Sequence, residues 1–266
     1  MTSFLQKLGC INTKSIRIGV RIFIILFMIS GCKPFPSQIP PKENFKEYVV
    51  LLHGLARSSK SMVPLQKALS KKGYGTCNID YPSTDYSIEH LSENYLSDTL
   101  KSCIPDDVDR VHFVTHSMGG IILRHYLKNN QFKRLGNVVM LSPPNAGTEV
   151  VDKLGNIFIF KALNGPASVQ LGTGSDSVPI GLGPVDFKLG ILTGSKTINP
   201  ILSAMIPGED DGKVSVQSAQ IQGMSDFMVV PHSHPFIMRS KETITQTIYF
   251  LEHRKFQNDP DKNEID

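Results

Sequence analysis

Three separated segments of the chain carry side chains suited to nucleophilic catalysis. Ser117 comes first, the acids Asp210 and Asp211 follow, and the histidines His232 and His234 come last. A serine hydroxyl is a weak nucleophile at its ordinary pKa, so it needs a histidine base that is held by a carboxylate. The order of serine, acid and histidine therefore predicts an activated serine, with the choice of acid and of base still open.

The elements that must position these side chains alternate between short apolar runs and amphipathic stretches. The apolar runs predict buried strands at 49–52, 75–81, 111–115, 138–141, 187–192 and 227–230. Apolar residues spaced by three and four predict helices at 61–72, 88–100, 119–128 and 244–251. This alternation predicts a parallel sheet, whose strands present their carboxyl ends at one functional edge.

The segment around Ser117 resembles the nucleophile elbow G-x-S-x-G of α/β-hydrolases. In such a sharp turn the residues two before and two after the serine crowd each other. Gly119 fits this requirement, whereas Thr115 is bulkier than the expected glycine. The resemblance implies that the turn exposes the Ser117 hydroxyl and directs the Met118 N–H toward an oxyanion.

The strand end before this elbow resembles the HG segment of bacterial lipases. It reads Leu52-His53-Gly54-Leu55, and the match implies that the Leu55 N–H is the second oxyanion donor. The same match places His53 and Gly54 in substrate binding, because a glycine lets the backbone approach the substrate. The alternative is an ordinary tight turn.

Later motifs are similar to those of small bacterial lipases and esterases, the lipase-like α/β-hydrolases. Residues 143–147 read P-P-N-A-G and residues 211–214 read D-G-K-V. The second motif resembles the signature around the lipase acid and favours Asp211 over Asp210. The ending H-P-F-I-M that begins at His234 resembles H-x-F-[IM]-M and favours His234 over His232.

These segments also allow less specific interpretations than catalysis. The acids at 209–211 could form a solvated turn or a weak calcium site. His232 and His234 would share a side of an extended strand and could bind a metal, but no third ligand is evident, so neither metal nor cofactor is predicted. The other histidines are expected to be structural or exposed, and they include His116, the variable residue inside the elbow.

The family resemblance covers roughly residues 47–255 and implies an α/β-hydrolase domain at 48–255, followed by a polar tail at 256–266. The sheet should be minimal, with about six mostly parallel strands flanked by helices, because the usual first two strands of larger hydrolases are missing. Residues 148–185 form the insertion where such proteins carry a cap. It is expected to be either a mobile lid or a fixed helix over the sheet.

Residues 1–31 are interpreted as a secretory leader. Eight apolar residues, Ile22–Ile29, are too few to span a bilayer, which takes about 20. The ending Ile29-Ser30-Gly31-Cys32 resembles a bacterial lipobox, which implies cleavage after Gly31 and lipidation of Cys32. Lys33 then favours the outer membrane, and the proline-rich residues 32–47 would be a tether. An uncleaved N-terminal anchor is the alternative.

The charge distribution limits the possible partners. The chain has 28 Lys and Arg against 24 Asp and Glu, and the basic residues of the leader account for the net charge of +4. A neutral body gives no support to nucleic-acid binding. Four cysteines are too few for a disulfide scaffold, and a Cys77–Cys103 pair is left open.

Three functions remain in competition. The first is a membrane-tethered serine hydrolase that cleaves carboxylic esters of lipids or small molecules through an acyl-enzyme. The second is an acyltransferase that uses the same three side chains, with an alcohol in place of water. The third is a non-catalytic binding lipoprotein on a hydrolase fold, against which the intact order of Ser117, Asp211 and His234 argues.

Overall fold

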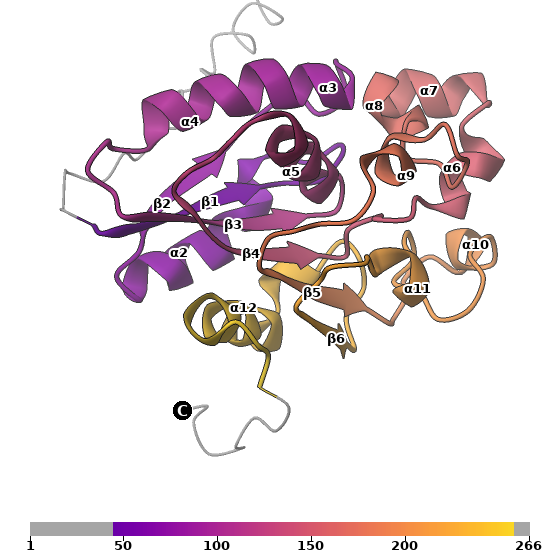
Figure 1. The fold of residues 1–266 in the computed structure, drawn as a ribbon. Coiled ribbons are helices and arrows are strands. Elements are labelled where there is room, and N and C mark those ends of the chain that lie inside the picture. The colour runs from indigo at the N-terminus through magenta and orange to yellow at the C-terminus, as the bar shows by residue number, and fades with distance from the viewer. Residues whose placement is uncertain (1–44, 258–266) are drawn as a thin grey trace, which may run out of the picture. The chain divides into compact units, whose positions relative to one another are not determined.

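Six parallel strands form one open sheet in the order β2-β1-β3-β4-β5-β6 (Figure 1). The computed structural model describes residues 45–257, and the leader, Cys32 and nearly all of the polar tail lie outside that range. The strands are β1 Glu47–Leu52, β2 Gly75–Ile79, β3 Arg110–His116, β4 Leu135–Leu141, β5 Leu189–Gly194 and β6 Asp226–Val230. Each coincides with a predicted strand, so the sheet expected from the sequence is confirmed.

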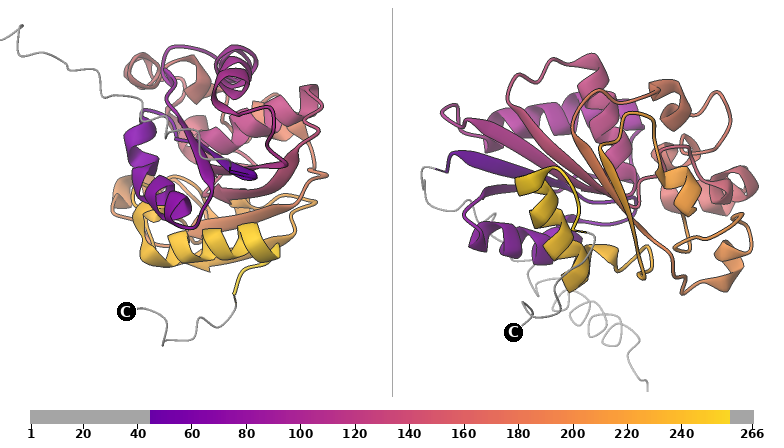
Figure 2. Two further views of the ribbon diagram at one scale, coloured as in Figure 1. Left: turned by 90° about the vertical axis from the view of Figure 1, so that its left-hand side faces the viewer. Right: turned by 60° about the horizontal axis from the view of Figure 1, so that its bottom comes forward.

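Helices cover both faces of the sheet, which explains why its strands are apolar on both sides (Figures 1 and 2). In β1, Val49 and Leu51 pack with α2 (Val63–Lys71) and α12 (Lys241–His253), together with η1 (Ser59–Met62). Val50 and Leu52 face the opposite core, which holds α5 (Met118–Asn129) and a continuous helical segment. That segment comprises α3 (Ile88–His90), the π-helical η2 (Leu91–Leu96) and α4 (Ser97–Cys103).

A disulfide joins Cys77 of β2 to Cys103 at the end of α4, with 6.1 Å between the two Cα atoms. The sequence left this pairing open. The bond fastens the long helical segment to the strand at the edge of the sheet, on the face that also holds α5.

The insertion between β4 and β5 consists of short helices. They are α6 (Glu149–Leu154), α7 (Phe158–Asn164), α8 (Pro166–Val169) and α9 (Val178–Leu182). Its inner part is fixed, because the buried guanidinium of Arg124 on α5 donates to the carbonyls of Pro179 (3.0 Å) and Gly183 (2.8 Å). In contrast, α7 buries none of its residues, and Phe158 is 81% exposed. The insertion therefore combines a fixed inner part with an exposed outer helix.

Three short helices lie in the connections that follow β5 and β6. They are α10 (Pro200–Ser203), α11 (Val216–Ala219) and η3 (Ile237–Arg239). None of the helices within residues 45–257 is long and apolar enough to cross a membrane.

Candidate active site

Ser117 occupies a strained turn between β3 and α5. Its φ of 53° and ψ of −126° lie in a region that residues other than glycine rarely adopt. The turn is held because the Ser117 N–H donates to the Leu141 carbonyl of β4 at 2.8 Å. The residue is 9% exposed, at the carboxyl edge of the sheet.

The glycines after Ser117 make room for two different neighbours. A Cβ on Gly119 would lie 2.6 Å from the carbonyl oxygen of His53 at the end of β1. A Cβ on Gly120 would lie 3.2 Å from the Thr115 hydroxyl oxygen. The elbow motif predicts that Gly119 relieves crowding against Thr115. In the structure Gly120 borders the Thr115 side chain, which explains how the elbow accommodates a threonine.

His234 joins Ser117 to Asp211 through its two ring nitrogens. Its Nε2 lies 3.0 Å from the Ser117 Oγ, and its Nδ1 lies 2.7 Å from an Asp211 carboxylate oxygen. The three residues come from the turn after β3, the loop after β5 and the loop after β6, so the parallel sheet brings them to one edge. A carboxylate that accepts from Nδ1 leaves Nε2 as the atom that can take a proton from Ser117.

Asp211 is fully buried and is held as a carboxylate. Its other oxygen accepts from the N–H groups of Lys213 (3.0 Å) and Val214 (2.9 Å). Burial alone would raise its pKa, but the neighbouring His234, the Ser142 hydroxyl and the Val214 N–H lower the pKa below its ordinary value. Asp211 is therefore ionised over the pH range in which an imidazole titrates.

The competing acid and histidine point elsewhere. Asp210 accepts from the Ser203 hydroxyl and from the Gly212 N–H, both at 2.6 Å. His232 Nε2 lies 3.1 Å from a Glu242 carboxylate oxygen on α12. The expected alternation of faces does not place His232 beside His234, because both follow the end of β6 and lie in a loop. No group of three or more metal-ligating side chains occurs in the described part of the chain.

The two expected oxyanion donors lie at the same edge as Ser117. Within residues 45–257, neither the Leu55 N–H nor the Met118 N–H donates to a protein group. The loop after β1 packs on the elbow, since a Cβ on Gly54 would lie 3.1 Å from the Ser117 Cβ. Both N–H groups are thus available for an oxyanion beside the serine.

His53 braces this loop from beneath. It is fully buried, its Nδ1–H donates to the Gly54 carbonyl at 2.8 Å, and its Nε2 accepts from the Tyr81 N–H at 3.3 Å. Its ring stacks on Tyr81 at 4.0 Å, and the Tyr81 hydroxyl donates to the His53 carbonyl. Its position supports the shape of the loop and leaves no surface for contact with a substrate.

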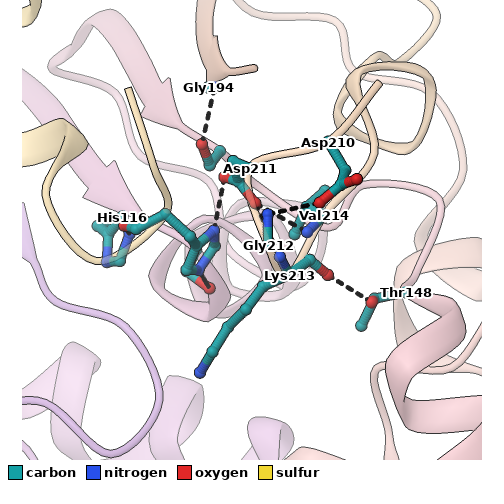
Figure 3. Close-up of polar contacts among 11 residues, drawn as sticks. His116, Thr148, Gly194, Asp210, Asp211, Gly212, Lys213 and Val214 are labelled. Carbon is teal, nitrogen blue, oxygen red and sulfur yellow. Dashed lines mark hydrogen bonds and ion pairs between the residues drawn. The ribbon is translucent and has the colours of Figure 1, made fainter. Parts of the chain in front are cut away.

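Sequence reasoning missed two residues that contact the catalytic candidates. His116 donates from Nε2 to the His234 carbonyl at 3.0 Å (labelled in Figure 3). Ser142 has a φ of 46° at the end of β4, and its hydroxyl accepts from the Gly194 N–H at 3.2 Å. The strand-end position of Ser142 could have drawn attention to it. His116 gave no signal, because the residue before the serine is variable in the elbow motif.

The chain resembles known hydrolases in both sequence and fold. A family model described as the alpha/beta hydrolase fold matches residues 47–160. The mature lipase BlEst2 of Bacillus licheniformis superposes with a TM-score of 0.63 and 21% identity, over 80% of this chain and 95% of that one. A metagenomic carboxyl esterase gives a TM-score of 0.63 and 15% identity, over 79% of this chain and 76% of that one.

A phospholipase is also similar. Phospholipase PlaB of Legionella pneumophila gives a TM-score of 0.62 and 22% identity, over 77% of this chain and 57% of that one. No curated protein sequence matches the chain. The matching family model, the six parallel strands and these superpositions agree, and the chain therefore has the α/β-hydrolase fold.

Proposed function

We propose that this chain is a serine hydrolase that cleaves carboxylic esters through an acyl-enzyme on Ser117, His234 and Asp211. One observation carries the proposal: a continuous hydrogen-bond chain runs from Asp211 through His234 to Ser117, with contacts of 2.7 and 3.0 Å. These are the separations that a serine, its base and the group orienting that base need.

The proposed reaction has two steps. The Ser117 Oγ attacks the ester carbonyl carbon while its proton passes to His234 Nε2, and the Leu55 and Met118 N–H groups stabilise the oxyanion. Collapse of this intermediate breaks the carbon–oxygen bond, and the departing alcohol takes the proton from His234. A water molecule then attacks the acyl-enzyme and gives its proton to His234, which returns one to Ser117 as the acid leaves.

The proposed location is the outer membrane or its periplasmic side, where lipidated Cys32 would anchor the enzyme. The proposal depends on the lipobox-like ending and on the basic, apolar leader of residues 1–31. The Cys77–Cys103 disulfide supports export, because disulfides persist in oxidising compartments. A membrane anchor would favour substrates that are themselves lipids.

The test combines active-site labelling with a double-mutant cycle. Wild-type protein should bind a fluorophosphonate and hydrolyse nitrophenyl esters, and a series of acyl chain lengths would define the preferred acyl group. Ser117→Ala should abolish the labelling and lower turnover by about 10⁴-fold or more. His234→Ala should lose nearly as much and the double variant little more, because the two side chains act as a unit.

His232→Ala is the matched control, since His232 pairs with Glu242 on the protein surface. It should stay close to wild type, and circular dichroism should show that every variant is folded. Wild-type turnover by folded Ser117→Ala would exclude the serine-hydrolase mechanism. Product analysis with an added alcohol would reveal acyl transfer if ester rather than acid accumulates.

A further inference from the structure

Three cationic side chains are carried by segments at the carboxyl edge of the sheet, where Ser117 lies. Arg57 follows β1, Lys213 lies in the turn that carries Asp211, and Arg239 ends η3 after β6. The segments are neighbours, because η1, which begins just after Arg57, packs against η3. A shallow pocket of about 130 Å³ has Lys213 and His234 in its lining. The three residues are called the cationic rim below.

No acidic side chain in the described part of the chain forms an ion pair with the rim. Within residues 45–257, none of the three side chains forms an ion pair or a side-chain hydrogen bond. The acids nearest in sequence to Lys213 are engaged elsewhere, since Asp211 binds His234 and Asp210 binds Ser203 and Gly212. Figure 3 shows the Lys213 side chain pointing away from both carboxylates.

The positive charges of the rim act on one another and on the elbow. Removal from water lowers the pKa of Arg57, and the charge of Arg239 lowers it further. Desolvation and the charge of Arg57 lower the pKa of Lys213, and they outweigh the opposing charge of Asp211. Burial, His234, Arg57 and Lys213 together hold the pKa of His116 well below its ordinary value. Two unpaired cations therefore project a positive field onto the residue next to Ser117.

An unpaired, half-buried guanidinium is costly unless an anion binds it. Arginine presents a fork of N–H donors that suits a phosphate, and lysine adds a compact second charge. Large apolar side chains are exposed on the elements around the same edge, and Phe158, Ile159, Leu163, Ile198 and Ile201 are all at least 64% exposed. Apolar surface beside a cationic rim suits a molecule that has both an acyl chain and an anionic head group.

We propose that Arg57 and Lys213 bind the phosphate of a lipid head group, so that the preferred substrates are acyl esters of phosphorylated glycerol. This inference rests on the proposed ester hydrolase and names its substrate class. The phosphate would lie on the alcohol side of the scissile bond, and binding it would orient the ester carbonyl toward Ser117. Arg239 would strengthen the field from its more exposed position.

The test compares two substrates that differ only in the phosphate. Full-length protein is given lysophosphatidic acid and the monoacylglycerol with the same acyl chain, in mixed micelles at low ionic strength, where charge effects are least screened. Wild type should show a higher kcat/KM for the phosphorylated ester. Arg57→Gln and Lys213→Gln should each lower the ratio of the two kcat/KM values by about 10- to 100-fold, the loss expected for one charge-assisted hydrogen bond.

Lys188→Gln is the matched control. Lys188 is exposed and directly precedes β5, so it lies at the opposite edge of the sheet. Its substitution by glutamine removes the same charge without changing the rim. Its substrate ratio should equal that of wild type, and circular dichroism should show that all variants are folded.

Each possible result decides between the two proposals. Hydrolysis of both lipids without preference for the phosphate would overturn the inference and leave the ester hydrolase standing. An unchanged ratio in the Arg57 and Lys213 variants would overturn the assigned residues. An equal fall of the kcat/KM ratio in Lys188→Gln would show a general effect of charge and no specific binding site. Wild-type protein inactive on every ester would remove both proposals.

Discussion

His116 donates a hydrogen bond from its Nε2 to the backbone carbonyl of His234 at 3.0 Å, and the two rings lie 4.8 Å apart. The residue before the proposed nucleophile thus holds the backbone of the proposed base. Burial, His234 and Arg57 lower the pKa of His116, and its Nε2 carries the proton that is donated to the carbonyl. His116 therefore stays neutral beside the His234 ring, which would become charged during the proposed reaction. His116 is in this sense a positioning residue.

His116→Phe should lower kcat about 10-fold and leave KM nearly unchanged, because one hydrogen bond to the His234 backbone is lost. His116→Gln keeps an N–H donor and should recover part of the rate. Steady-state kinetics on a short nitrophenyl ester would measure both variants. Equal losses in the two variants would point to packing of the ring in place of the hydrogen bond.

Asp211→Asn should lose about 10⁴-fold in turnover, because an amide neither fixes the His234 tautomer nor stabilises an imidazolium. Asp210→Asn is the neighbouring control and should lose far less, since Asp210 contacts only Ser203 and Gly212. The measurement is kcat on the same ester, with circular dichroism for folding. The reverse ranking of the two variants would show that Asp210 is the functional acid.

Removing the disulfide by a Cys77→Ala and Cys103→Ala double substitution should lower the free energy of unfolding by about 3.5 kcal/mol, the entropic value for a closed loop of this size. Urea unfolding monitored by circular dichroism would measure the loss. A reductant should weaken wild type to a similar degree and leave the double variant unaffected. Identical unfolding of oxidised and reduced wild type would argue against the bond.

Cys32→Ser should abolish metabolic labelling of the protein with palmitate, because the cysteine sulfur would be the acyl acceptor of the lipobox. Cys10 lies in the same leader, and the Cys10→Ser variant is the control that should keep the palmitate label. Labelling and membrane fractionation would be read in the same cells. Persistent labelling of Cys32→Ser would refute lipidation at this residue.

The sheet could be predicted from the sequence because strands buried on both faces leave uninterrupted apolar runs. The grouping of Ser117, Asp211 and His234 could be predicted for a related reason, since each lies in the connection that follows one of these apolar strands. Parallel strands carry their carboxyl ends to one edge whatever the intervening chain does.

Other features of the site depend on contacts between distant segments. The separation of His232 from His234 arises in a loop, where the alternation of a strand does not apply. The contact of His116 with His234 joins positions 118 residues apart, and the neighbour of Thr115 is Gly120, where the motif suggested Gly119. No local pattern encodes such pairings, so only the folded chain reveals them.

The contacts of Arg124 determine which parts of the insertion can vary in sequence. Its guanidinium binds the carbonyls of Asn145, Pro179 and Gly183 from the helix that begins next to Ser117. The inner part of the insertion is therefore bonded to the helix that follows Ser117. A substitution that breaks these hydrogen bonds would disturb the position of Ser117. No α7 residue is fully buried, and only Phe160 packs partly against the core, so the other positions of α7 can change in sequence at little cost to folding. Sequence change is therefore tolerated in the outer helix, while the inner part stays tied to the turn that carries Ser117.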